Sequence, residues 1–281
     1  MQRRSGARQD GGARGVRRAG LHGLLRPLPG GEFAEGSGRH TVPQPLTRAV
    51  DAGLRGSGRR GTVVHVLRGP NGDTLLRPED LPAEVAATTV LHFGSISLLR
   101  GTTATTIAGL VERLRGRTLL SFDPNIRSSL IGDEPAFRRL LAPLLHLADI
   151  VKMSEADARW LAPDRSPEAV AGELVESGPA LVVITQGARG AYARTAALQA
   201  RITAPRVRVV DTVGAGDAFT AGLLFALARQ EVTARAGFAR LDSDGLDTAL
   251  RFAAAAAALA CTRAGADPPR LGEIEEFLGR Y

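Results

Sequence analysis

The stretch DTVGAGDAFTAGLL, residues 211–224, does most to decide the fold of this chain. The valines just before it are typical of a β-strand, and the apolar residues after it recur at helical spacing. The sequence therefore predicts a strand over 206–210, a glycine-rich turn over 214–216 and a helix over 214–229.

The turn and the helix start together place an acid beside an anion site. Glycines in the turn allow backbone N–H groups to approach a ligand closely. A helix N-terminus adds unpaired N–H donors and a partial positive charge. Asp217, in the first helical turn, is then placed to take a proton from an attacking hydroxyl. This indicates phosphoryl transfer to an alcohol; the alternative interpretation is an ordinary tight turn with a helix-start acid.

The rest of the chain beyond residue 61 alternates between strand-like and helical segments. The predicted strands are 62–67, 89–93, 118–122, 149–152, 181–185 and 206–210. The predicted helices are 102–115, 135–147, 155–161, 167–176, 214–229 and 245–260. This alternation predicts an α/β fold with a mostly parallel sheet and helices on both faces.

Polar or glycine-bearing segments follow five of the predicted strands. Ligands bind beyond the carboxyl ends of the strands in such sheets, so we expect these segments to meet at one rim. They are 94–97, 123–127, 152–155, 185–190 and 211–217.

Charge and composition exclude several classes of function. Of the net charge of +7, residues 1–60 carry +8, from twelve arginines and four acids, which leaves the remainder at −1. A nucleic-acid binder usually interleaves basic residues with aromatics, and Phe33 is the one aromatic in residues 1–60. No apolar run is long enough to span a membrane. Cys261 is the single cysteine, which fits a reducing cytoplasm. We therefore expect a cytoplasmic protein that binds neither nucleic acid nor membrane.

Four further segments, together with DTVGAGDAFTAGLL, resemble the PfkB family of carbohydrate kinases over roughly residues 62–281. They read LHFGSISLL, SFDPNIRSSL, KMSEADARWL and VVITQGARGAY, in the family's order. Their sequences are most similar to those of bacterial fructokinases, and next to those of 2-keto-3-deoxygluconate kinases. The resemblance implies a ribokinase-like three-layer sandwich and ATP-dependent phosphorylation of a sugar hydroxyl.

The resemblance also implies roles for the residues of the turn and of the substrate side. Asp217 would be the catalytic base that deprotonates the sugar hydroxyl and so contacts the substrate. The backbone amides of Gly214, Ala215 and Gly216 would form the anion hole for the transferred phosphoryl group. Two further residues would contact the substrate, namely Arg68 and Asn125. For the Asp-Pro-Asn step that contains Asn125, a simple turn is the alternative interpretation.

Nucleotide and cation sites are implied in the same way. Thr185 and Gly187 match the start of the nucleotide site, and Ala264 and Gly265 match the loop that closes over adenine. Glu155 matches the acid that organises Mg²⁺ near the phosphates. Backbone carbonyls around residues 211–213 are candidates for a monovalent cation such as K⁺. A helix C-cap at Gly265 and a plain helix-start acid at Glu155 remain the alternatives.

Residues 1–60 depart from the family's pattern. They are rich in Gly and Arg and lack a sustained period, which predicts a poorly ordered segment ahead of a kinase domain over 61–281. Family members open with an acid-ended strand and a Gly-Gly motif followed by Asn, and here Gly30 and Gly31 lack that Asn. We therefore expect the N-terminal part of the fold to be incomplete and kinase activity to be impaired.

The function predicted from these observations is that of a fructokinase-like sugar kinase. The alternatives left open are a 2-keto-3-deoxygluconate kinase, a ribose or nucleoside kinase, and a nucleotide-binding relic without sugar kinase activity. The expected partners are a sugar and ATP, with a homodimer as the expected assembly.

Overall fold

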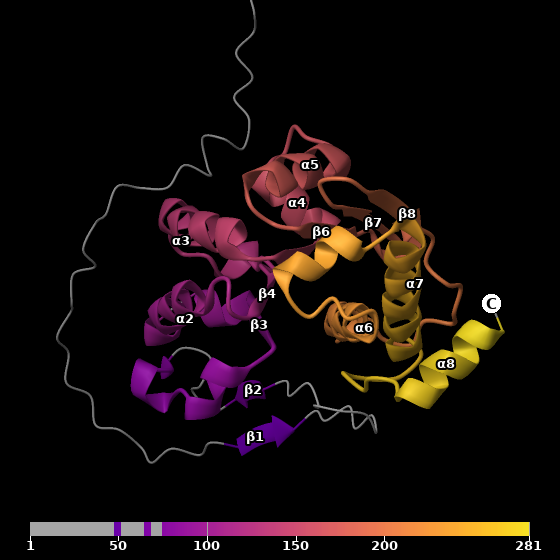
Figure 1. Ribbon diagram of the computed structural model, residues 1–281, viewed down its shortest axis with the longest axis horizontal. Helices are drawn as coiled ribbons and strands as arrows, with labels where there is room; N and C mark the ends of the chain where they lie inside the picture. The colour runs from indigo at the N-terminus through magenta and orange to yellow at the C-terminus, as the bar shows by residue number, and fades with distance from the viewer. Residues whose placement is uncertain (1–47, 52–64, 69–74, 100, 281) are drawn as a thin grey trace, which may run out of the picture.

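The computed structural model describes residues 48–51, 65–68, 75–99 and 101–280 (Figure 1). A two-stranded antiparallel sheet joins β1, Arg48–Asp51, to β2, His65–Arg68. A six-stranded sheet has the order β3-β4-β5-β6-β7-β8, with β3 to β6 parallel and the last two strands antiparallel. Its strands are β3 Val90–Gly94, β4 Leu119–Asp123, β5 Ile150–Ser154, β6 Leu181–Thr185, β7 Ala191–Arg194 and β8 Gln199–Ile202.

Helices cover both faces of the six-stranded sheet, which gives three layers (Figure 1). One face carries α2 Gly101–Leu114, α3 Glu134–Leu147, α4 Glu155–Leu161 and α5 Pro167–Ser177. The other face carries α6 Ala215–Arg229, α7 Ser243–Ala260 and α8 Leu271–Gly279. Short 3₁₀ helices lie at Pro78–Asp80, Ala83–Ala87, Ser95–Leu98, Ser128–Leu130, Gly187–Arg189 and Arg235–Arg240.

Several helices begin at side chains that satisfy their free N–H groups. Asp133 accepts from the Ala136 N–H at the start of α3, and Asp242 accepts from the Gly245 N–H at the start of α7. Ser154 and Asp157 form a reciprocal capping box at the start of α4. These caps fix the residue at which each helix begins.

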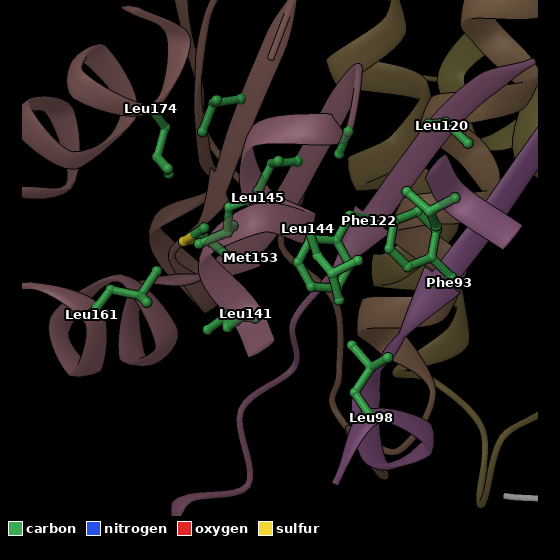
Figure 2. Packing of buried hydrophobic residues seen from close by; sticks show 14 of the residues in the cluster. Phe93, Leu98, Leu120, Phe122, Leu141, Leu144, Leu145, Met153, Leu161 and Leu174 are labelled. Atoms are coloured by element: carbon green, nitrogen blue, oxygen red, sulfur yellow. The ribbon is translucent and has the colours of Figure 1, made fainter. Parts of the chain in front are cut away.

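The face of β3 to β6 under α2 to α5 is apolar. Phe93 of β3 stacks on Phe122 of β4 with ring centroids 4.8 Å apart, and Leu98 lies in the same cluster (Figure 2). Leu144 and Met153 belong to the same cluster, contributed by α3 and β5. Burial of these side chains is the main source of cohesion between the layers.

The face under α6 to α8 changes character along the strands. Residues alternate between the two faces of a strand, so His92, Ser121 and Lys152 face α6 while their neighbours join the opposite core. At the amino ends of the strands this face is apolar, as at Val90 and Leu119. Buried polar groups therefore gather at the carboxyl ends, beneath the start of α6.

The predicted alternation of strands and helices and the mostly parallel sheet are confirmed, with shifts of one or two residues at most ends. The strand predicted over 206–210 is wrong, because that segment pairs with no strand among the described residues and Val209 and Val210 are 59% exposed. The antiparallel strands β7 and β8 and the helix α8 were not predicted. Apart from β1, the segment 1–60 lies outside the described residues, as do the predictions made for it.

No helix in the described part of the chain is long and apolar enough to cross a membrane.

Candidate active site

The start of α6 presents free backbone donors beside an exposed acid. Gly214 precedes the helix with a φ of 79°, a left-handed conformation that glycine adopts without strain, and no side chain caps the helix. The Ala215 N–H bonds to the Thr212 carbonyl at 3.2 Å, which leaves the Gly216 and Asp217 N–H groups without a partner among the described residues. Asp217 lies in this first turn with its side chain exposed.

Asp211 holds the loop before α6 against the loop after α7. Its carboxylate accepts the Val213 N–H at 3.1 Å and the Gly265 N–H at 2.8 Å, and these bonds hold the pKa of Asp211 below its usual value. A Cβ on Gly214 would lie 3.1 Å from the Ala266 side chain. The predicted adenine loop is therefore packed directly against the predicted anion hole.

The rim at the ends of β3 and β4 has an unusual backbone. Gly94 has a φ of 141°, and a Cβ there would lie 1.8 Å from the Asp123 carbonyl oxygen, so only glycine fits. Ser95 and Asn125 also have positive φ, and the Asn125 side-chain amide donates to Ser95 Oγ at 3.2 Å. Such conformations cluster at functional sites. Asn125 is thus fixed at the rim where substrate contact was predicted.

Beneath the start of α6 lies a cluster of polar side chains from three neighbouring strands. Lys152 Nζ donates to Asp123 Oδ2 at 2.8 Å, and His92 Nδ1 lies 3.0 Å from Ser121 Oγ. Burial lowers the pKa of His92; the charges of Asp123 and Asp217 oppose this shift and that of Lys152 adds to it. The charges of Asp123, Lys152 and Asp217 therefore all act on the same imidazole. Asp217 thus interacts electrostatically with the residues at the ends of β3, β4 and β5.

Glu155 begins α4 on the same rim and is paired with arginines. It forms ion pairs with Arg189 and, at 3.9 Å, with Arg159. The hydrogen bond from Arg189 lowers the pKa of Glu155, so the carboxylate is ionised and suited to a cation.

The donor set of the rim fits Mg²⁺ bound together with phosphates. Mg²⁺ in nucleotide sites is commonly held by one or two carboxylates and by substrate phosphates. Glu155 supplies one such carboxylate, and the described residues contain no group of three or more His, Cys, Asp or Glu side chains that would hold a metal by themselves. A metal at Glu155 would compete with Arg189 for the carboxylate.

The two nucleotide-site residues predicted after β6 lie next to Glu155. Thr185 ends β6, pairs in register with Ser154 and donates through Oγ1 to the Met153 carbonyl at 3.3 Å. Gly187 begins the short helix that carries Arg189 and has a φ of 57°.

The remaining predicted residues divide into two groups. Gly265 and the exposed Ala264 lie in the loop against Gly214, and Asn125 lies at the rim. Arg68 ends β2, and its side chain lies outside the described residues.

Three members of the polar cluster were not predicted as site residues. No role was assigned from the sequence to Lys152 or His92, and Asp123 entered only as the first residue of the Asp-Pro-Asn step. The signal that could have found them is a polar residue at an inward position near the carboxyl end of a buried strand, as in LHFG, SFDP and VKMS.

Comparison with known proteins gives a consistent picture. A model described as pfkB family carbohydrate kinase matches residues 59–271. A fructokinase of Klebsiella pneumoniae is 36% identical over 223 residues, covering 75% of this chain and 71% of the relative. A fructokinase of Rhizobium leguminosarum bv. trifolii is 36% identical over 172 residues, covering 61% of this chain. This chain spans 53% of that relative's length.

Solved structures show the same similarity. Aminoimidazole riboside kinase from Salmonella enterica, complexed with aminoimidazole riboside and an ATP analogue, has a TM-score of 0.63 and 31% identity, covering 77% of this chain and 71% of that one. A double mutant of the fructokinase from Vibrio cholerae O395, bound to fructose, ADP and a potassium ion, has a TM-score of 0.65 and 27% identity, covering 84% of this chain and 74% of that one.

Proposed function

Because the chain belongs to the pfkB family of carbohydrate kinases, we propose that it transfers the γ-phosphoryl group of ATP to a hydroxyl of a sugar, with fructose as the preferred substrate. The observation that carries this proposal is the start of α6. There, an uncapped helix N-terminus, a left-handed glycine and the exposed Asp217 lie within one turn. Fructose is preferred because the similar proteins named above include three fructokinases.

In the proposed reaction the residues of α6 act on opposite sides of the transferred group. Asp217 accepts the proton of the sugar hydroxyl as its oxygen attacks the γ-phosphorus. The free amides of Gly216 and Asp217 donate to the phosphoryl oxygens on which negative charge develops, which is the kind of interaction that lowers such barriers most. The helix dipole adds to this stabilisation.

Cations complete the proposed site. We propose that Glu155 helps to hold Mg²⁺, which would neutralise phosphate charge, and that Arg189 then exchanges the carboxylate for a phosphate oxygen. We also propose a K⁺ site at the carbonyls around residues 211–213, supported by the potassium ion in the Vibrio cholerae fructokinase structure. Turnover measured in K⁺ should exceed that in Na⁺ at equal ionic strength.

A riboside is the second candidate substrate. The supporting observation is the similarity to an aminoimidazole riboside kinase at 31% identity, which lies close to the values for the fructokinases. Specificity for one sugar is decided by hydroxyl contacts, and sites built to bond a hydroxyl reject substrates that lack it. A substrate panel therefore separates the two candidates.

The proposal is tested on the purified 281-residue chain with ATP, Mg²⁺ and K⁺. ADP formation above the sugar-free background would be measured with fructose, 2-keto-3-deoxygluconate, ribose and aminoimidazole riboside, with the product identified by mass spectrometry. We expect the highest kcat/KM with fructose. Phosphorylation of none of the four at millimolar concentration would refute the kinase proposal.

Calorimetry with a non-hydrolysable ATP analogue and with fructose separates an active kinase from a nucleotide-binding relic. The kinase gives heat with both ligands. A relic gives heat with the nucleotide alone.

A further inference from the structure

Lys152 is a buried ammonium group at the centre of the sheet's polar cluster. It lies on β5, between Val151 and Met153 of the apolar core, and its side chain is only 5% exposed. Burying an ammonium group is costly unless it is paired, and here Asp123 Oδ2 at 2.8 Å is the pairing partner. A buried pair of this kind is weak evidence for a purely stabilising role, because apolar residues of similar volume often stabilise as well.

The ammonium group keeps donors to spare. An ammonium carries three N–H bonds, and among the described residues Lys152 donates to Asp123 alone. Two donors therefore remain for a ligand. Asp123 is already engaged on its other side, since Oδ1 accepts the Asn125 N–H at 3.1 Å.

The direction of the spare donors is given by the start of α6. A Cβ built on Gly216 would lie 3.1 Å from Lys152 Nζ, so the ammonium group approaches the helix in the space that glycine leaves open. Gly216 and Asp217 carry the free amides of the helix start. An anion bound to these amides would therefore lie beside the ammonium group.

Charge balance gives the ammonium group a role when that anion is a phosphate. Asp217 lies in the helical turn that carries the free amides, and Asp123 is paired with the ammonium group beside Gly216, so both carboxylates would repel a phosphoryl group bound there. His92 is the third titratable group of this cluster, and burial and the Lys152 charge lower its pKa, which favours the neutral imidazole. Lys152 is the positive side chain of this cluster that offsets the repulsion.

We propose that Lys152 is a further catalytic residue of the phosphoryl-transfer site. Its ammonium group is paired with Asp123, lies in the space beside Gly216, and binds the γ-phosphoryl group during transfer. This inference rests on the proposed kinase function. In the step, the sugar O–H gives its proton to Asp217, the sugar oxygen–phosphorus bond forms, and the bond between the γ-phosphorus and the β–γ bridging oxygen breaks. The electron pair leaves with ADP, and Lys152 keeps its proton throughout.

The competing explanation is that Lys152 only neutralises Asp123. Lys152→Met removes the positive charge and leaves the buried carboxylate of Asp123 without its partner, so the free energy of unfolding is expected to fall. Lys152→Met combined with Asp123→Asn leaves a neutral pair of similar volume and restores the charge balance. If neutralisation is the whole role, the double variant should regain the properties of the original chain.

The test compares turnover and nucleotide affinity in the original chain, the single variant and the double variant. We expect the double variant to fold with near-original stability yet to lose about 10²- to 10³-fold in kcat, as for removal of one donor to a developing charge. Calorimetry should show a larger loss of affinity for an ATP analogue than for ADP, since only the former carries the γ-phosphoryl group. Arg235→Met, which breaks the ion pair with the buried Asp149 away from the site, is the matched control and should keep full turnover.

Failure of the inference and failure of the proposed function give different results. If the original chain is active and the double variant keeps its kcat and its ATP preference over ADP, Lys152 is structural and the inference is wrong. If the original chain phosphorylates no sugar but binds ATP more tightly than ADP, the affinity ratio of the variants still decides the role of Lys152. If the original chain binds neither nucleotide, both proposals fall.

Discussion

The two faces of the six-stranded sheet are built from the same strands and differ in what they bury. Under α2 to α5 the residues of β3 to β6 that face the helices are apolar, with Phe93 stacked on Phe122. Under α6 to α8 the apolar surface stops short of the carboxyl ends, where the Asp123–Lys152 pair and His92 replace it. The first face stabilises the fold by burying apolar side chains. The second buries polar groups at a cost in free energy and thereby places them beneath a helix N-terminus.

Asp217→Asn is the change expected to separate function from stability most completely. The variant keeps the helix start but removes the proposed base, and a positioned general base contributes about 10²- to 10⁴-fold to a rate. We expect a fall in kcat of that size with fructose and ATP, and an unchanged unfolding midpoint. The matched control is Asp244→Asn, in the exposed first turn of α7 on the same face, which should retain full turnover. Normal turnover in Asp217→Asn would remove Asp217 from the role of base.

Phe122→Ala addresses the opposite face. Phe122 is fully buried and stacks on Phe93, so truncation leaves a cavity and should lower the free energy of unfolding by about 3–5 kcal/mol. Its neighbour on the strand, Ser121, faces the other side, and Ser121→Ala should lower it by only about 1 kcal/mol through loss of the His92 hydrogen bond. Urea unfolding of both variants measures the difference. Equal losses would show that the two faces contribute alike.

The sequence predicted the apolar face better than the polar one, for a physical reason. Strand and helix periodicity is a local property, and segments such as 155–161 and 181–185 were predicted at their observed bounds. The valines before the motif gave the same strand signal, yet 206–210 joins no described strand, because strand propensity does not provide a hydrogen-bonding partner. The backbone N–H of Val210 in this segment donates instead to the Cys261 carbonyl.

The polar cluster was missed because it depends on contacts between distant segments. Lys152 and Asp123 are 29 residues apart, and Gly216 is a further 64 residues along the chain from Lys152. Only the register of β4 and β5 and the seating of α6 bring the three together. The residues near Asp217 in sequence could be assigned from the motif, whereas those near it in space could not.

Glu155→Gln tests whether the rim beyond β5 belongs to the functional side. If Glu155 helps to hold Mg²⁺, the neutral variant should need about 10-fold or more Mg²⁺ for half-maximal turnover, the lower end of the range for lost metal-site groups. The matched control is Glu168→Gln, a first-turn glutamate of α5 that is likewise paired with an arginine, Arg201, and whose pKa is likewise held low. If both variants need the same increase in Mg²⁺ concentration for half-maximal turnover, or if Glu155→Gln needs no increase, Glu155 does not bind Mg²⁺.

His92→Asn tests the cost of burying polar groups on the α6 face, and its effect is the smallest. Burial lowers the pKa of His92 below its ordinary value of 6.5, against the opposing charges of Asp123 and Asp217 and with that of Lys152. Below pH 6.5 the unfolded chain therefore binds a proton that the folded chain does not. The free energy of unfolding should then fall as the pH drops from 6.5 towards the lowered pKa, by at most about 1.4 kcal/mol per pH unit from this group.

Asparagine can still bond to Ser121 but does not titrate, so the variant should lose this part of the pH dependence while its stability above pH 7 changes little. Urea unfolding of both proteins at pH 5.5, 6.5 and 7.5 measures the slope. The same slope in both would mean that the imidazole is protonated as readily in the folded chain as in the unfolded one. The main cost of burying charge on this face would then lie in the Asp123–Lys152 pair, whose side chains are both almost fully buried.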